Sequence, residues 1–148
     1  MSSDKRLSNA YKRAKTIAFD DSSKFILFSD CHRGDNSFAD EFANNRNIYY
    51  HALKHYFNNG FQYCELGDGD ELWENLSFEP IFEAHKNIYM LMKRFHAENR
   101  LHMIFGNHDM VYRNPAYVQN HLFTYFEPKE GKETGLLDQI QFHEAILL

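Results

Sequence analysis

Three short apolar segments, far apart along the chain, each end in a group of polar residues. The segments cover residues 25–28, 61–66 and 101–105 and are rich in aromatic and aliphatic side chains. Short apolar runs of this composition are typical of buried strands. Between them, apolar residues recur at helical spacing over about 44–58 and 80–99. The order strand, helix, strand, helix, strand predicts an α/β fold with a parallel sheet and right-handed crossovers.

A polar group follows each apolar segment directly. The three groups are Ser29-Asp30-Cys31-His32, Gly67-Asp68 and Gly106-Asn107-His108-Asp109. In a parallel sheet the carboxyl ends of the strands open onto one crevice, so we expect these groups to lie close together. Carboxylate, imidazole and amide side chains are ligands that suit Mn, Fe or Zn. The sequence therefore predicts a metal centre at this edge of the sheet.

Four side chains are the candidate metal ligands. Asp30 and His32 are two residues apart and, on an extended segment, point the same way, so they can bind one cation. Asp68 follows Gly67, whose missing side chain permits a tight turn, and it is the candidate to bridge two cations. Asn107 offers an amide oxygen to the second cation. Two divalent metal ions are thus the expected cofactors.

Such a site fits the hydrolysis of a phosphate ester or pyrophosphate by a metal-bound water, with a phosphorylated substrate as partner. His108, beside Asn107, is placed to donate a proton to the leaving oxygen. Arg33 and Arg113 lie just beyond two of the polar groups and, with Asn107, are candidates to bind substrate phosphate. Surface solvation is the alternative for both arginines. Asp70 is expected to hold Arg33 or a metal-bound water, or to serve in a turn.

The polar groups resemble the first three motifs of the calcineurin-like metallophosphoesterases. The residues that carry the resemblance are Ser29-Asp30-Cys31-His32, Gly67-Asp68-Gly69-Asp70-Glu71 and Gly106-Asn107-His108-Asp109. The resemblance covers about residues 25–109 and implies a β-sandwich flanked by helices. It also implies a two-metal centre bridged by Asp68, with Asp30 and His32 on one metal and Asn107 on the other.

The same resemblance implies two catalytic residues. His108 would act on the leaving group, and Glu71 would pair with His108. Members of the family complete their metal ligands with later histidines, one isolated and one pair in a Gly-His-x-His motif, and neither pattern occurs here. His121 and His143 are the only histidines after His108. Residues 1–148 are therefore expected to form a single domain, equivalent to the N-terminal half of a metallophosphoesterase domain.

The missing histidines support a second hypothesis. On that hypothesis the chain is a truncated, catalytically impaired metal-binding remnant with a structural or partner-dependent role. A third hypothesis is that a partner chain completes the site by supplying the missing ligands. Metal content and turnover distinguish the first two hypotheses.

The composition of the chain indicates which broad class of protein it belongs to and where it is expected to be located. An apolar content of 43% in 148 residues indicates a globular domain, and a net charge of -5 gives no general attraction to nucleic acid. The first twenty residues are polar and basic with no apolar core of a signal peptide, and no segment is long enough to span a membrane. Two cysteines, Cys31 and Cys64, define no disulfide framework. A cytoplasmic location without a membrane partner is expected.

The two ends of the chain carry weaker signals. A helix with a basic, solvated face is expected over residues 4–15. After residue 109 the pattern indicates a helix over 114–126, a loop over 128–135 and one strand over 139–148.

Overall fold

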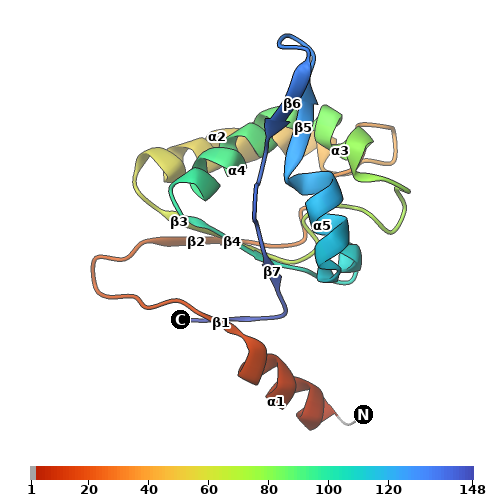
Figure 1. The fold of residues 1–148 in the computed structure, drawn as a ribbon. Coiled ribbons are helices and arrows are strands. Elements are labelled where there is room, and N and C mark those ends of the chain that lie inside the picture. The colour runs from red at the N-terminus through yellow and green to blue at the C-terminus, as the bar shows by residue number, and fades with distance from the viewer. Residues whose placement is uncertain (1–2) are drawn as a thin grey trace.

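The fold is built on a four-stranded parallel sheet in the order β2-β3-β4-β7 (Figure 1). It was obtained as a computed structural model, which describes residues 3–148. The strands are β2 (Phe25–Phe28), β3 (Gln62–Leu66), β4 (Leu101–Ile104) and β7 (Phe142–His143). Each neighbouring pair is parallel, with Leu27 opposite Cys64 and Cys64 opposite His102. The predicted α/β class with a parallel sheet is confirmed.

Two helices cover one face of this sheet. Helix α2 (Arg46–Asn58) joins β2 to β3, and α4 (Lys86–Ala97) precedes β4, which makes both helices crossover connections (Figure 1). Between them and the sheet lies an aromatic core in which Phe57 and Phe95 contact edge to face at 4.9 Å. Tyr63 of β3 packs on Phe95 at 5.7 Å and on Phe28 of β2 at 5.9 Å. Burial of each such ring contributes about 1.5–3 kcal/mol, which fixes the helical layer on the sheet.

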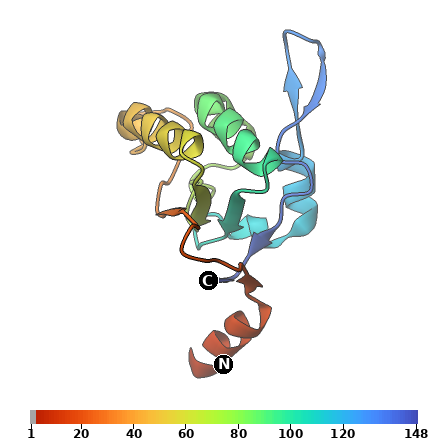
Figure 2. The ribbon, with the colours of Figure 1, turned by 90° about the vertical axis from the view of Figure 1, so that its left-hand side faces the viewer.

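The opposite face of the sheet carries the two ends of the described chain. Helix α1 (Ser3–Arg13) leads into β1 (Lys15–Thr16), which pairs in parallel with β8 (Ile146–Leu147). Figures 1 and 2 both show β1 across the sheet from α2 and α4, with α1 extending away from it. None of the helices among residues 3–148 has both the length and the apolar character needed to cross a membrane.

The segment expected as one helix over 80–99 is two helices. Helix α3 (Phe78–Ala84) ends at His85, and α4 begins at Lys86. The imidazole of His85 is buried, and its Nε2 lies 2.9 Å from Oδ2 of Asp40, a residue of the loop after β2. This long-range contact turns the chain at His85, so the single-helix prediction is wrong.

The last third of the chain also differs from expectation. After η1 (Ala43–Asn45) near α2, the remaining elements are η2 (Met110–Arg113), α5 (Pro115–Leu122), β5 (Thr124–Glu127) and β6 (Lys132–Gly135). Strands β5 and β6 form an antiparallel hairpin that projects from the body (Figure 2). The predicted helix therefore ends four residues early, the predicted loop contains a strand, and residues 139–148 form two short strands in different sheets.

Candidate metal centre

The loops that follow β2 and β3 run side by side beyond the edge of the sheet. The amide of His32 donates to the carbonyl of Asp68 at 2.9 Å, and the amide of Arg33 donates to that of Gly69 at 3.0 Å. In return, the amide of Glu71 donates to the carbonyl of Arg33 at 2.9 Å. These bonds extend the β2-β3 pairing past the strand ends and bring residues 30–33 beside residues 67–71.

The backbone at three candidate ligands has an uncommon conformation. Asp30, His32 and Asp68 have φ angles of 53°, 48° and 51°, in the left-handed region that side chains usually avoid. The segment after β2 is therefore not uniformly extended, contrary to expectation, because Asp30 and His32 both adopt positive φ angles. Strained backbone of this kind is concentrated at functional sites.

The third loop, after β4, packs tightly against the second. A Cβ atom on Gly106 would lie 2.2 Å from Oδ1 of Asp68, so only glycine fits this position. The amide of His108 donates to the same oxygen at 2.7 Å. Asp109 joins the loops further, because its carboxylate accepts from the amides of Gly69 at 2.9 Å and Gly106 at 2.5 Å. Burial raises the pKa of Asp109 to about 6.

These loops bring three of the four predicted ligands together. Asp30, His32 and Asp68 each offer a donor atom within 4.8 Å of the others, and Nε2 of His32 lies 3.8 Å from Oδ1 of Asp30. Metal–ligand bonds of about 2.0–2.2 Å require these donor atoms to lie closer together, and the Asp30 side chain is 70% exposed. Asn107, the fourth, is exposed on the adjoining loop between Gly106 and His108.

Glu71 orients two histidines at this centre. Its Oε2 accepts from Nδ1 of His32 at 2.8 Å and from Nδ1 of His108 at 2.7 Å. The implied contact between Glu71 and His108 is thus present. A carboxylate on one ring nitrogen leaves the other nitrogen of His32 on the side of Asp30, an arrangement typical of metal-binding histidines. The residues present therefore fit a divalent cation.

The hydrogen bonds of Glu71 also determine the charge states of Glu71 and His108. The hydrogen bond to Glu71 raises the pKa of His108 above its ordinary value. Burial works against ionisation of Glu71, but hydrogen bonds from His108 and His32 hold its pKa below the usual range. His108 also contacts the exposed ring of Trp73 at 4.8 Å between centroids. Glu71 thus stays ionised while His108 favours its protonated form.

A cavity of about 490 Å³ opens beside these histidines. His32, Glu71 and His108 line one side, and the rest carries further carboxylates. These carboxylates belong to Asp35, Asp40, Glu41 and Glu74. The cavity has no lysine or arginine in its lining. An anionic substrate would be repelled here unless bound cations offset the carboxylates.

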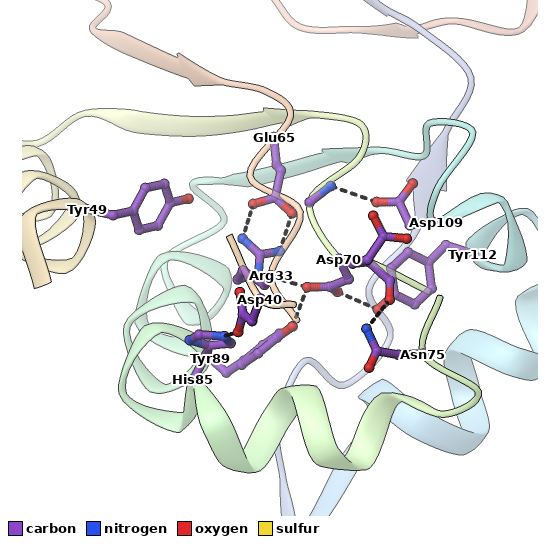
Figure 3. A network of polar contacts seen from close by, with 12 residues as sticks. Arg33, Asp40, Tyr49, Glu65, Asp70, Asn75, His85, Tyr89, Asp109 and Tyr112 are labelled. Atoms are coloured by element: carbon purple, nitrogen blue, oxygen red, sulfur yellow. Dashed lines mark hydrogen bonds and ion pairs between the residues drawn. The ribbon is translucent and has the colours of Figure 1, made fainter. Parts of the chain in front are cut away.

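The predicted role of Arg33 in substrate binding is wrong. Its side chain is 0% exposed, and its Nη1 and Nη2 donate to the two oxygens of Glu65 at 2.7 Å each (Figure 3). Its Nε donates to Asp70 at 2.7 Å, while Tyr89 and Tyr112 donate to Asp70 at 2.5 Å each. Of the three roles weighed for Asp70, the structure shows the contact with Arg33. The sequence hint for this network was Glu65, a carboxylate inside an apolar strand.

Three other residues weighed as ligands or substrate contacts are not among these donors. Arg113 is exposed at the end of η2 and lines a different cavity, next to Gln141 and His143. His121 donates to Glu79 at 2.6 Å, on α5. Cys31 is mostly buried, and burial raises the pKa of its thiol to about 11. The structure therefore assembles the centre from the three loops alone.

Comparisons of the chain with protein-family models, curated proteins and solved structures found no match. A function for this chain therefore has to be inferred from the arrangement of its own residues. The feature that is most informative about function is the group of carboxylates and imidazoles that three separate loops bring together.

Proposed function

We propose that this chain hydrolyses a phosphate ester or a pyrophosphate with the help of two divalent cations. The observation that carries the proposal is the meeting of Asp30, His32 and Asp68 within 4.8 Å. The resemblance to the calcineurin-like metallophosphoesterases points the same way. We also propose that the fold is a β-sandwich. The β2-β3-β4-β7 sheet would be one of its two sheets, and the separate β1-β8 pair would belong to the other.

Each ligand has a defined part in this proposal. Asp30 and His32 would hold one cation, Asp68 would contact both, and Asn107 would contact the second. Bound cations of this kind offset the charge of a phosphate and make water a better nucleophile near neutral pH. The hydrogen bond from the His108 amide fixes the Asp68 carboxylate, so its orientation does not depend on the cations.

His108 is the proposed proton donor to the leaving oxygen. Glu71 occupies its Nδ1, which leaves Nε2 as the nitrogen available to a substrate. Because Glu71 raises the pKa of His108, the imidazole keeps its proton at pH values where a free histidine loses it. His108 lines the cavity beside the metal ligands, where a leaving group would lie.

The proposal is tested by the variants Asp68→Asn and Asn107→Ala, assayed for Mn-stimulated hydrolysis of an aryl phosphate. Both should lose about 100-fold or more in rate, because bound cations contribute several kcal/mol to such reactions. Asp21→Asn, which removes an exposed carboxylate outside the donor groups, should keep the full rate. Full activity in both site variants would disprove the assignment.

A second candidate function is a catalytically impaired metal-binding protein with a structural or partner-dependent role. It is favoured by the small set of ligands assigned above to the second cation, which consists of Asp68 and Asn107. Metal content per chain distinguishes the two candidates. Two equivalents with turnover support the hydrolase, and one or none without turnover supports the alternative. Turnover that rises more than linearly with protein concentration would indicate a partner chain that completes the site.

A further inference from the structure

A second cavity, of about 440 Å³, lies where β4 begins, between the junction of α1 and β1 and the segment that enters β7. Its lining is basic and carries no carboxylate. The basic side chains belong to Arg13, Lys15, His96, His102 and His143. Three amide side chains complete the polar part of the lining. The candidate metal centre lies at the other end of β4, and the two cavities have no lining residue in common.

Lys15 occupies this cavity as an ammonium bonded to a neutral base. Its Nζ lies 3.1 Å from Nδ1 of His102, and an ammonium can only donate, so Nδ1 accepts. Nε2 of His102 then carries the ring proton and donates to Oε1 of Gln62 at 2.8 Å. His102 is therefore neutral, in agreement with burial and the charge of Lys15, which lower its pKa to about 4.

The charge of Lys15 is consequently not offset by its neighbours. None of the ion pairs among residues 3–148 involves Lys15. Of the three N–H groups of its ammonium, one donates to His102 and two are left for another ligand. The backbone holds the residue in place, because the Lys15 amide donates to the carbonyl of Ala145 at 3.0 Å within the β1-β8 pair.

The other basic side chains of the cavity differ in the partners that they already contact. Arg13 pairs through Nη2 with Glu144 at 3.0 Å, at an exposed position. His96 lies 2.6 Å from the carbonyl of Asp138, to which its Nε2 donates. His143 lies on β7, and burial and Lys15 lower its pKa, which an anion would reverse. Lys15 is thus the main source of positive potential, with Arg13 and His143 beside it.

We propose that this cavity binds an oxyanion of the phosphate class, with Lys15 as its principal ligand and Arg13 and His143 as further donors. A partly desolvated ammonium gains most from a charged hydrogen-bond acceptor, and the lining supplies none. The volume suits a phosphate group carried by a small molecule. This site is independent of the proposed hydrolase function and shares none of its residues.

The test uses the full chain in EDTA, so that no cation at the metal centre can hold phosphate. Inorganic phosphate and glycerol phosphate are titrated separately by calorimetry and by NMR. Saturable binding is expected, with shifts at Lys15, His102 and His143. Tighter binding of glycerol phosphate would identify a phosphorylated metabolite as the ligand, and equal or tighter binding of inorganic phosphate would identify the free ion.

Lys15→Met should weaken phosphate binding by about tenfold or more, because a charge-assisted hydrogen bond is lost. Lys15→Arg, which keeps the charge, should bind within about a few-fold of the native chain. Lys54→Met, which removes an exposed lysine of α2, and Asp68→Asn should leave affinity unchanged.

Three results would overturn the proposal. These are native affinity in Lys15→Met, shifts confined to residues 30–32 and 67–71, and no saturable binding by the native chain. If Lys15→Met fails to fold, the shift map of the native chain and the affinity of Lys15→Arg decide instead. Two results would then contradict the proposed phosphate site. These are loss of binding in a folded Lys15→Arg variant, and NMR shift changes in the native chain at residues outside β4, β7 and Lys15.

Discussion

Histidines in this chain differ according to what their ring nitrogens contact. His108 donates to an ionised carboxylate, which favours its charged form. His102, on β4, the strand that leads into the loop of His108, accepts from an ammonium, which favours its neutral form. The two residues are only six positions apart, so sequence distance does not decide their charge. The surrounding donors and acceptors do.

Because His102 is neutral in the folded chain, we expect the free energy of unfolding to depend on pH. Its folded pKa of about 4 lies below the ordinary value of 6.5, so the unfolded chain takes up the proton first as the pH falls. The contribution of His102 is fully present above pH 6.5 and is lost progressively toward pH 4. We expect a loss in unfolding free energy on the order of 2 kcal/mol, less than for a fully desolvated ring.

His102→Gln should flatten this part of the stability profile, because an amide can still accept from Lys15 but does not titrate. Urea unfolding at several pH values, in a buffer free of phosphate, measures the effect. His51→Gln, at an exposed position of α2, should keep the native pH dependence. Parallel profiles for His102→Gln and the native chain would show that His102 carries none of the acid sensitivity.

At the scale of elements, Arg33 ties the loop after β2 to β3 and to the loop that follows it. Its guanidinium contacts Glu65 of β3 and Asp70 of that loop, and all three side chains are buried (Figure 3). Arg33→Met would leave both carboxylates buried without a cation. We expect a loss of about 3–5 kcal/mol in the free energy of unfolding, measured by urea denaturation.

Arg113→Met is the matched control for this prediction. Arg113 is exposed at the end of η2, so its replacement should change stability by no more than about 0.5 kcal/mol. Native stability in Arg33→Met would show that the buried charges relax into solvent or become neutral. In that case the three-way contact would not be what holds the loops together.

The elements that were predicted correctly are those whose sequence pattern lies within a few neighbouring residues. The apolar runs of β2, β3 and β4 and the turn at Gly67 can be seen in short windows, and so the convergence of Asp30 and Asp68 was expected. The break at His85 was not, because it depends on Asp40, which lies 45 positions away along the chain. The burial of Arg33 depends in the same way on its distant partners.

Hairpin β5-β6 escaped prediction for a different reason. Its two strands pair with each other, β5 contacts the helices through a few side chains such as Tyr125, and β6 is polar with exposed residues at most positions. Such strands lack the apolar alternation that marks a half-buried strand. The turn between the strands includes Gly131 with φ of 63°, and a single glycine is not distinctive in sequence.

For the whole molecule, the two ends of β4 have opposite electrostatic character. One end opens onto a cavity rich in carboxylates, and the other begins beside a cavity lined by basic side chains, among them Lys15 and Arg13. With separate linings, the two should act independently, since residues without shared partners usually contribute additively. Cation binding at one end should therefore not respond to a charge change at the other.

Mn²⁺ should stabilise the folded chain by binding to the candidate ligands on the loops after β2, β3 and β4. At a concentration about 100 times its Kd, a cation that binds only the folded chain adds about 2.7 kcal/mol, which raises the Tm of a domain this size by about 5–10 °C. Asp68→Asn should abolish the rise, because it removes the carboxylate that is proposed to contact both cations. Lys15→Met should keep it in full. Differential scanning calorimetry with and without Mn²⁺ measures both, and an equal rise in Asp68→Asn would place the cation elsewhere on the chain.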